Sequence, residues 1–406
     1  MNTVSQRRRT LDCVSVLALT VDDAFAALAA IAGPDAADPY SRPRGLGALG
    51  ALPRGVRLGV PMPGQRLFFG DQASDAAYDA ALARLQRLGA AIVAFDMEPF
   101  YQAARLLYEG PWVAERYLVA RALIASEPEA MHPVTRQIIL GGAKPSAADA
   151  FAAFYELEAL RRVRDHAFRS IDAMALPTVP TVYTVEQVLA DPITLNSRLG
   201  TYTNFVNLLD LCALSVPASM RADGTPFGVT LVAPAGADAA LAALGRAFHA
   251  DTALPLGATG TAQPPLAAIS ARAADNEIAV AVVGAHLSGM PLNRELTSFG
   301  ARFLEESATA ADYRLFLLPG APAKPGLIRV DAGGAAIAVE VWALPADEFG
   351  RFVASVPPPL SIGTLALADG RKVKGFLAEA VATHGARDIS AFGGWRAFMA
   401  QAKLPA

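Results

Sequence analysis

The pattern of the chain changes at Gly257, and this change constrains the fold more than any other feature of the sequence. Before it, alanine-rich segments with helical spacing alternate with short β-branched runs, which is typical of an α/β domain. Residues 258–276 are dominated by Ala, Thr, Pro and Gly, as linkers often are. Beyond them strand-like runs prevail. The sequence therefore predicts a first domain at 1–257, a linker at 258–276 and a small α+β or barrel-like domain at 277–406.

Local patterns predict the elements of both domains. In the first domain we expect helices at 21–31, 75–88, 111–125, 147–169 and 238–250, with Thr20, Ser74 and Ser146 as N-caps. We expect strands there at 55–60, 91–95, 172–177 and 227–232, and a helix start at 202–211. In the second domain we expect helices near 293–306 and 346–353, and strands at 278–283, 313–318, 326–330, 335–342, 363–366 and 373–378.

Composition and charge exclude several classes of protein. The 406 residues carry 35 Lys and Arg against 38 Asp and Glu, and 53% are hydrophobic, so we expect neither a disordered chain nor a nucleic-acid binder. Cys13 and Cys212 lie far apart without metal-ligand spacing, so we expect no disulfide framework, no metal, and a reduced, cytoplasmic protein. Export is an alternative, because Arg7–Arg9 precede an apolar run at 13–21, but polar residues interrupt that run. No apolar run reaches about 18 residues, so no membrane span is expected.

Several segments resemble one group of enzymes. Four runs resemble the C-terminal half of amidase-signature hydrolases: LDCVSVLALTVDDAF (11–25), DAMALPTVP (172–180), TYTNFVNLLDLCALSVPA (201–218) and GTPFGVTLVAP (224–234). Within that superfamily, three further runs resemble allophanate hydrolases: DPYSRP (38–43), RLFFGD (66–71) and LLYEGPWVAERY (106–117). Three runs in the second domain resemble the C-terminal module of the same family: VVGAHLSGMPLNRELTSFGA (282–301), KPGLIRV (324–330) and ISAFGGWRAF (389–398).

This resemblance implies a fold and an activity. The fold is α/β, a partial amidase-signature domain followed by a small α+β domain of the γ-glutamyl-cyclotransferase type. The activity is hydrolysis of allophanate to ammonia and carbon dioxide in urea degradation, by acyl transfer to a serine supported by a second serine and a lysine, without a cofactor. A homodimer and a metabolic link to a urea carboxylase are implied as well.

The sequence departs from the family pattern at the nucleophile. In the family, the lysine and the Gly/Ser-rich segment of the triad precede the Leu-Asp-Cys-Val-Ser motif, and this sequence reaches that motif at residue 11. Residues 1–10 supply no such segment, and none occurs later. We therefore expect an N-terminally shortened allophanate hydrolase that lacks the amidase nucleophile. Two alternatives are a non-catalytic fragment that binds or scaffolds, and one half of a split enzyme.

Tyr108 and Arg116 are the expected substrate-binding residues. Allophanate carries a carboxylate, and a guanidinium fork binds a carboxylate through two hydrogen bonds. By resemblance these two are the family's substrate-binding Tyr and Arg, with the Tyr108 hydroxyl reaching the substrate from a loop. The alternative is a solvated arginine and a packing aromatic. A polar cluster, Asn196, Tyr202, Asn204 and Asn207, is interpreted as turn and cap residues around Gly200.

His286 is the expected catalytic residue of the second domain. It follows a predicted strand in Gly-Ala-His-Leu-Ser-Gly, where a turn into a helix presents backbone N–H groups to an anion. The resemblance implies N-carboxycarbamate as substrate, and an imidazole can deliver the required proton near neutral pH. The alternative is a structural histidine. Cyclotransferases use a glutamate after the strand that 339–343 resembles, whereas here Asp347 and Glu348 follow in a different context.

Overall fold

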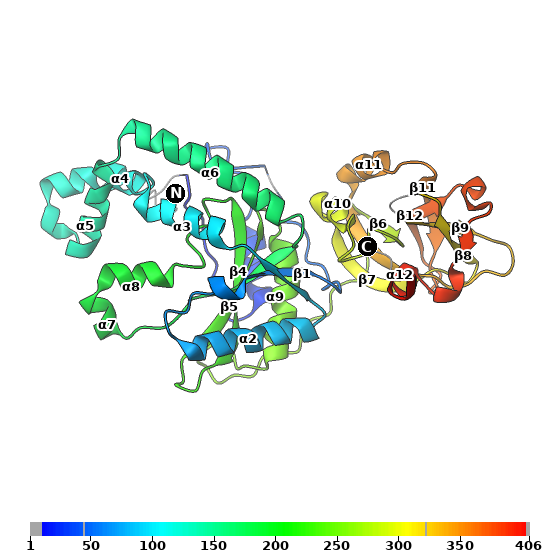
Figure 1. Ribbon diagram of the computed structural model, residues 1–406, viewed down its shortest axis with the longest axis horizontal. Helices are drawn as coiled ribbons and strands as arrows, with labels where there is room; N and C mark the ends of the chain where they lie inside the picture. The colour runs from blue at the N-terminus through cyan, green and yellow to red at the C-terminus, as the bar shows by residue number, and fades with distance from the viewer. Residues whose placement is uncertain (1–9, 44, 321–322, 403–406) are drawn as a thin grey trace. The chain divides into compact units, whose positions relative to one another are not determined.

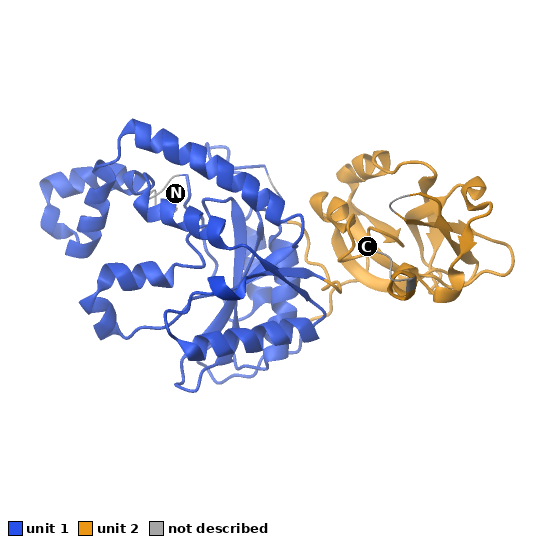
Figure 2. Ribbon diagram, viewed as in Figure 1, with its two compact units in different colours: residues 1–46, 56–266 blue, residues 47–55, 267–406 orange. Residues whose placement is uncertain are grey.

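The computed structural model describes residues 10–43, 45–320 and 323–402, and the basic start at 7–9 lies outside them. The chain divides into two compact units (Figure 2). Unit 1 comprises Met1–Leu46 and Val56–Leu266, and unit 2 comprises Gly47–Gly55 and Ala267–Ala406. The chain thus passes from one unit to the other inside the region expected to be a linker, but a short early segment also belongs to unit 2.

Unit 1 is an α/β unit built on one sheet (Figure 1). Its helices are α1 (Val21–Ile31), α2 (Gln72–Arg87), α3 (Glu98–Glu109), α4 (Val113–Ser126), α5 (Pro133–Leu140), α6 (Ala147–Ala167), α7 (Val185–Ala190), α8 (Pro192–Leu199) and α9 (Asp238–Thr252). Its strands are β1 (Arg57–Pro61), β2 (Ala91–Phe95), β3 (Ala173–Pro177), β4 (Leu211–Met220) and β5 (Pro226–Pro234). Among the described residues the strand order is β2-β1-β3-β5-β4, with β1 parallel to β2 and β3 and with β5 antiparallel to β3 and β4.

Helices pack against both faces of this sheet. On one face α2 and α9 contact β4 and β5, and α1 packs on α9. On the other face α3 contacts α6, and their apolar side chains form a core with Met174, Leu176 and Val232 of the sheet. The turns at 200–210 complete this core by burying Tyr202 and Phe205. This second layer holds α3 and the turns together, and the candidate site lies between them.

Helix caps agree with the sequence at two positions and differ at a third. Thr20 accepts a hydrogen bond from the Asp23 N–H and caps α1, and Ser146 forms a capping box with Asp149 at α6, as predicted. The cap of α2 is Asp71 and not Ser74, whose N–H donates to the Asp71 carboxylate at 3.0 Å. Burial would raise the pKa of Asp71, but hydrogen bonds from Ser74, Thr181 and Arg221 outweigh it and lower this pKa.

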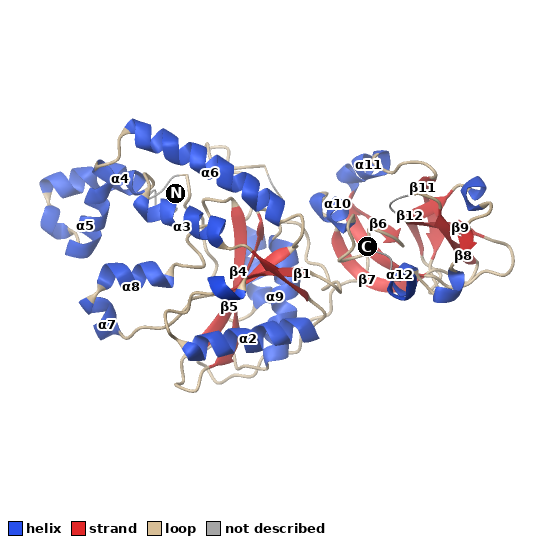
Figure 3. Cartoon of the chain, viewed as in Figure 1, coloured by secondary structure: helices blue, strands red, loops and turns tan. Residues whose placement is uncertain are grey.

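Unit 2 contains two sheets around one apolar core (Figure 3). Its helices are α10 (Asn293–Ser298), α11 (Ala346–Ala354) and α12 (Trp395–Ala402). Its strands are β6 (Glu277–Val282), β7 (Arg302–Ala308), β8 (Tyr313–Leu318), β9 (Lys324–Arg329), β10 (Ala338–Pro345), β11 (Leu360–Ala366), β12 (Lys372–Ala378) and β13 (Arg387–Asp388). In the described part of the chain the sheet orders are β11-β12-β6-β10-β7 and β13-β8-β9.

The segment Gly47–Gly55 packs on the strand β7 of unit 2. The Ala51 N–H donates to the Phe303 carbonyl at 3.0 Å, and Arg54 pairs with Glu306 at 2.9 Å. A Cβ on Gly50 would lie 2.9 Å from the Phe303 carbonyl oxygen, so the two backbones are in close contact. Local sequence patterns carry no signal for such a long-range contact, which is why the segment was assigned to the first domain.

Several segments differ from the local predictions, and three of them bear on the candidate sites or show how tertiary structure overrides a local pattern. Residues 98–109 form α3, which no local pattern predicted. Residues 202–210 form turns that lead directly into β4, where a helix start leading into an apolar turn was expected. The helix expected at 293–306 ends at Ser298, because Gly300 (φ +77°) turns the chain and β7 then pairs with β10. In that last segment tertiary pairing overrides a helical pattern.

Candidate functional site

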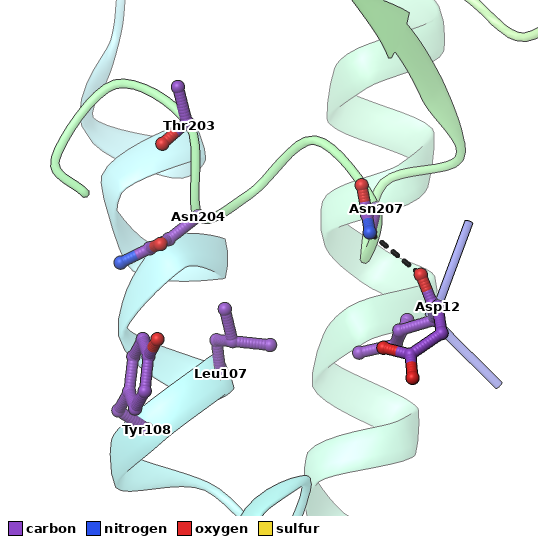
Figure 4. A pocket seen from close by; sticks show the side chains of 7 residues that line it. Asp12, Leu107, Tyr108, Thr203, Asn204 and Asn207 are labelled. Atoms are coloured by element: carbon purple, nitrogen blue, oxygen red, sulfur yellow. Dashed lines mark hydrogen bonds between the residues drawn. The ribbon is translucent and has the colours of Figure 1, made fainter. Parts of the chain in front are cut away.

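A small polar pocket lies in unit 1 (Figure 4). It has a volume of about 190 Å³ and is lined by Leu11, Asp12, Leu107, Tyr108, Thr203, Asn204 and Asn207. Pockets for drug-sized ligands usually measure about 300–1,000 Å³, so this one suits a smaller molecule. Most of its lining side chains carry hydrogen-bonding groups, so it favours a polar ligand.

Three segments bring the lining residues together. Leu107 and Tyr108 come from the last turn of α3, the polar side chains of Thr203, Asn204 and Asn207 come from the turns at 200–210, and 11–12 precede α1. The N-terminal segment is tied down on both sides. The Asn207 Nδ2 donates to the Leu11 carbonyl at 2.7 Å, and the Thr10 hydroxyl donates to Glu115 of α4 at 2.8 Å.

Asn204, which was interpreted as a turn residue, both packs on the turn and lines the pocket. A Cβ on Gly200 would lie 2.5 Å from the Asn204 Nδ2, so the Asn204 side chain packs directly on that glycine. Asn204 and Asn207 also line the pocket. The turn role was expected from the sequence and the place at the pocket was not, although polar side chains in an apolar neighbourhood were the available signal. Asp12 and Thr203 were missed as well.

Buried tyrosines hold the turns under the pocket. The Tyr202 hydroxyl accepts a hydrogen bond from the Leu67 N–H at 2.8 Å, and the Tyr101 hydroxyl donates to the Gln65 carbonyl at 2.9 Å. Burial raises the pKa of both tyrosines, so they stay neutral and keep these bonds. The turns at 200–210 and the end of α3 therefore have a rigid base.

The structure brings Tyr108 and Arg116 into contact. Tyr108 lies in the last turn of α3 and not in a loop, and Arg116 lies in the first turn of α4, with Gly110 ending the helix between them. The Arg116 guanidinium carbon is 5.6 Å from the centre of the Tyr108 ring, a cation–π contact. Tyr108 lines the pocket and is 42% exposed, whereas Arg116 reaches the pocket only through this ring.

His286 lies in unit 2 on the loop between β6 and α10. Its Nε2 is 3.0 Å from a carboxylate oxygen of Glu295, and its side chain is only 12% exposed. The ring stacks on Phe376 at 4.9 Å and meets the edge of Phe352 at 5.6 Å. Burial lowers the pKa of His286, and Glu295 offsets part of this effect. Sequence reasoning found the histidine but missed its carboxylate partner on α10.

The turn after His286 does bind an anion, and that anion belongs to the chain. The Ser288 N–H donates to the Glu340 carboxylate at 2.7 Å, and the Ser288 hydroxyl donates to the other oxygen at 2.7 Å. Glu340 is buried in β10 and was missed by sequence reasoning, which looked at Asp347 and Glu348 instead. A single glutamate inside the apolar run AVEVWALP was the available signal.

The described residues also set limits on other kinds of site. No helix in the described ranges combines the length and the apolar character that crossing a membrane would require. Nor do these ranges bring together three His, Cys, Asp or Glu side chains as a metal ion would require.

Comparison with known proteins identifies both parts of the chain. Residues 2–242 match the family described as amidase, and residues 278–400 match the allophanate hydrolase C-terminal domain. A urea amidolyase from Lachancea kluyveri is 36% identical over 408 residues, which cover 96% of this chain and 22% of that protein. This chain therefore spans less than a quarter of that relative.

Solved structures agree with these matches. The urea amidolyase of K. lactis is 37% identical with a TM-score of 0.69, covering 98% of this chain and 25% of that one. An allophanate hydrolase from Kluyveromyces lactis is 36% identical with a TM-score of 0.68, covering 98% of this chain and 67% of that one. These findings confirm the resemblance and the α/β fold class that the sequence indicated. The chain belongs to the amidase family, and within it to the allophanate hydrolases.

Proposed function

We propose that the chain acts in the hydrolysis of allophanate to ammonia and carbon dioxide. Unit 1 binds allophanate for cleavage of its terminal amide, and unit 2 breaks down the N-carboxycarbamate that results. The observation that carries this proposal is the contact of Tyr108 with Arg116 at a small polar pocket, in a chain of this family.

The charges around the pocket favour one orientation of the substrate. Arg116, held against the Tyr108 ring, attracts the carboxylate end of allophanate, and the Tyr108 hydroxyl can donate a hydrogen bond to it. Asp12 would repel that carboxylate, whereas it can accept hydrogen bonds from the amide N–H groups. The amide end therefore lies toward Asp12 and Asn207, on the side of the N-terminal segment.

The nucleophile for amide cleavage does not come from these 406 residues in our proposal. The support is the lack of a Gly/Ser-rich segment with a partner lysine in the sequence. Formation of an acyl-enzyme needs an activated hydroxyl beside an oxyanion site. The chain alone then binds allophanate but releases no ammonia from it.

The chemistry of unit 2 is a proton transfer in our proposal. N-carboxycarbamate loses carbon dioxide when its C–N bond breaks and the electron pair stays on nitrogen, which must gain a proton. The imidazolium of His286 delivers that proton and returns to the neutral form, which its buried position favours. Glu295 at 3.0 Å stabilises the imidazolium before the transfer. The nitrogen of the remaining carbamate then takes up a proton from water, and its C–N bond breaks to release ammonia and a second carbon dioxide.

The cellular setting forms part of the same proposal. We place the chain in the cytoplasm, as a homodimer, downstream of a urea carboxylase that supplies allophanate. The relatives named urea amidolyase support the metabolic link. Light scattering of the purified chain at several concentrations tests the dimer, and a monomer at every concentration would contradict it.

Ammonium release tests the amide-cleaving part of the proposal. The purified chain is incubated with allophanate beside two variants, Arg116→Ala and the control Arg121→Ala, which changes an exposed arginine on the same helix. We expect no ammonium above the uncatalysed background from any of the three. Calorimetry is expected to show allophanate binding to the wild type and to Arg121→Ala, and much weaker binding to Arg116→Ala. Ammonium release that falls in Arg116→Ala would show a nucleophile within the chain.

One observation favours a second candidate, half of a split enzyme. In unit 1, β4 is an edge strand of the described sheet, and Ala213, Ser215 and Pro217 on one of its faces are exposed. In the extended segment before α1, Leu17 is 97% exposed and Val14 is 57% exposed. An open edge strand and a set of exposed apolar side chains are each suited to pairing with another chain.

Reconstitution tests this second candidate. The tagged chain is purified from its native cell, and bound polypeptides are identified by mass spectrometry. The expected result is a partner that carries a lysine and a Gly/Ser-rich segment and that restores ammonium release when added to the purified chain. A partner without that segment, or a reconstituted pair without activity, would remove the split-enzyme candidate.

A further inference from the structure

A buried carboxylate lies under the loop that carries His286. Glu340 is 3% exposed and lies in the middle of β10, beside a β-bulge between Val341 and Trp342. Its Oε1 accepts hydrogen bonds from the Ser288 hydroxyl at 2.7 Å and from Arg396 Nη2 at 2.6 Å. Its Oε2 accepts from the Ser288 N–H at 2.7 Å and from Trp342 Nε1 at 3.1 Å. A buried charge is tolerated when it is paired and hydrogen-bonded to this extent.

These bonds leave Glu340 no chemistry of its own. A carboxylate offers about four acceptor sites, and four donors occupy this one. Its acceptor positions are therefore taken up by groups of the protein, and none is left to bind a substrate N–H or O–H. What it does is fix Ser288, two residues after His286, through both the backbone and the side chain. Arg396 of α12 strengthens the arrangement, because its Nη2 also donates to the Ser288 carbonyl.

The rest of the loop is held as tightly. The Asn293 Nδ2 donates to the His286 carbonyl at 2.8 Å, and the Leu292 N–H donates to the Ala285 carbonyl at 2.9 Å. The imidazole then sits between Phe376 and Phe352 with its Nε2 on Glu295. Because the loop backbone sets where the ring lies, a shift of Ser288 moves the ring away from Glu295 and out of its aromatic contacts.

We infer that Glu340 is a positioning residue, which acts through Ser288 to hold the His286 imidazole against Glu295 for proton transfer. This inference rests on the proposed function of unit 2, in which His286 protonates the substrate nitrogen. It assigns the anion at the turn to the protein itself, so the N–H of Ser288 takes no part in binding substrate. Arg396 acts with Glu340, since its Nη2 bonds both the carboxylate and the loop.

Glu340→Gln in the full chain tests the inference. The amide has the size of the carboxylate, but its NH₂ group faces donors, so one pair of the four bonds is lost and the loop is displaced. The chain is labelled with ¹⁵N in its five histidines, and the imidazole signals are recorded in the wild type and the variant. We expect the His286 signals to shift and the signature of the Nε2 bond to Glu295 to be lost. The signals of His132, His166, His249 and His384 are expected to stay in place.

Two further variants keep the test decisive. Glu348→Gln makes the same change at an ion pair with Arg351 on α11 and is expected to leave the His286 signals unchanged. Ser288→Ala removes one hydroxyl donor and retains the charged pair, so it is expected to fold even if Glu340→Gln does not, and to shift the His286 signals less but in the same direction. Unchanged His286 signals in a folded Glu340→Gln or Ser288→Ala chain would overturn the inference.

An activity assay combined with these spectra separates this inference from the proposed function. His286→Asn is assayed for carbon dioxide release from N-carboxycarbamate generated in place by an active allophanate-cleaving enzyme. Unaltered release would defeat the proposed role of His286 while leaving the imidazole shifts, and hence the contact from Glu340 to His286, established. Impaired release together with unshifted signals in Glu340→Gln would defeat only the positioning role.

Discussion

The guanidinium carbon of Arg116 lies 5.6 Å from the centre of the Tyr108 ring, so two side chains on separate helices are in direct cation–π contact. The ring lies at the pocket, and the arginine is held against it before any ligand arrives. Preorganisation of this kind lowers the entropy cost of binding. The pair therefore predicts that the ring and the hydroxyl of Tyr108 make separable contributions to allophanate binding.

Substitutions at Tyr108 measure these two contributions. Tyr108→Phe retains the ring and loses the hydroxyl, which as a hydrogen bond to a carboxylate contributes about 1.5–3 kcal/mol. Tyr108→Leu also loses the cation–π contact, which adds about 0.5–1 kcal/mol at an exposed position. We expect calorimetry to rank affinity as wild type, then Tyr108→Phe, then Tyr108→Leu. The control is Tyr155→Leu at an exposed position of α6, and equal affinity of Tyr108→Leu and wild type would refute the prediction.

Glu295→Gln is expected to lower the pKa of His286 further. Burial lowers this pKa and the Glu295 carboxylate raises it again, so removal of the charge leaves burial unopposed. The fraction of imidazolium at neutral pH then falls, and any reaction that needs the charged form moves its pH profile toward acid. A histidine NMR titration gives the pKa directly, with Glu306→Gln on β7 as the control. A pKa that stays constant or rises in Glu295→Gln would contradict this account.

Local patterns in the sequence predict the regular elements of unit 1 well. Helix α1 with its cap Thr20, strand β2 and the start of α6 with Ser146 agree with the structure residue by residue. These elements have strong periodicity and side-chain caps, which act over a few residues. Helix α3 was missed, and its absence from the prediction placed Tyr108 in a loop.

Contacts between distant segments explain the rest of the differences. Resemblance singled out Tyr108 and Arg116, but their contact with each other was not predicted, because no local pattern places one side chain on the other. Glu340 and Glu295 were missed because a carboxylate shows its role only through its partners, and Ser288 lies 52 residues from Glu340. The same reason hides the packing of Ala51 on Phe303. Residue type and local motif pointed to candidate side chains in the sequence, whereas the neighbours of those side chains are visible only in the structure.

From the burial of His249 we predict that the folded chain loses stability in mild acid. His249 lies in α9, is 5% exposed, and its Nε2 has no hydrogen-bond partner in the described part of the chain. Burial lowers its pKa below the ordinary value of about 6.5, so below that pH the unfolded chain binds a proton more readily than the folded one. The contribution of His249 to stability is therefore complete above about pH 6.5 and falls as the pH decreases, by about 1.4 kcal/mol for each unit of the shift.

Urea unfolding at several pH values checks this sign. Carboxylates such as Asp71 and Glu277 also have lowered pKa values, so they add their own loss in acid and a variant is needed. We expect His249→Leu to lose less stability than the wild type between pH 7.5 and pH 5.5. The exposed His384→Leu should behave as the wild type. If both histidine variants follow the wild-type curve, burial of His249 carries no pH dependence.

We predict that alanine at Gly289 destabilises the chain, and that part of this effect comes from a contact with a segment far away in the sequence. Gly289 follows Ser288 on the His286 loop with φ +71°, and a Cβ there would lie 2.6 Å from the carbonyl oxygen of Gly55. Gly370 has a similar φ of +86°, but a Cβ on it would meet nothing within 4 Å. Alanine at Gly370 therefore adds only backbone strain, about 1–2 kcal/mol. Alanine at Gly289 adds the same strain and also pushes the segment 47–55 away from the rest of unit 2. We expect Gly289→Ala to lower the free energy of unfolding more than Gly370→Ala does, and to speed amide hydrogen exchange at Ala51. Equal losses in the two variants, with exchange at Ala51 unchanged, would mean that the loop yields without disturbing this segment.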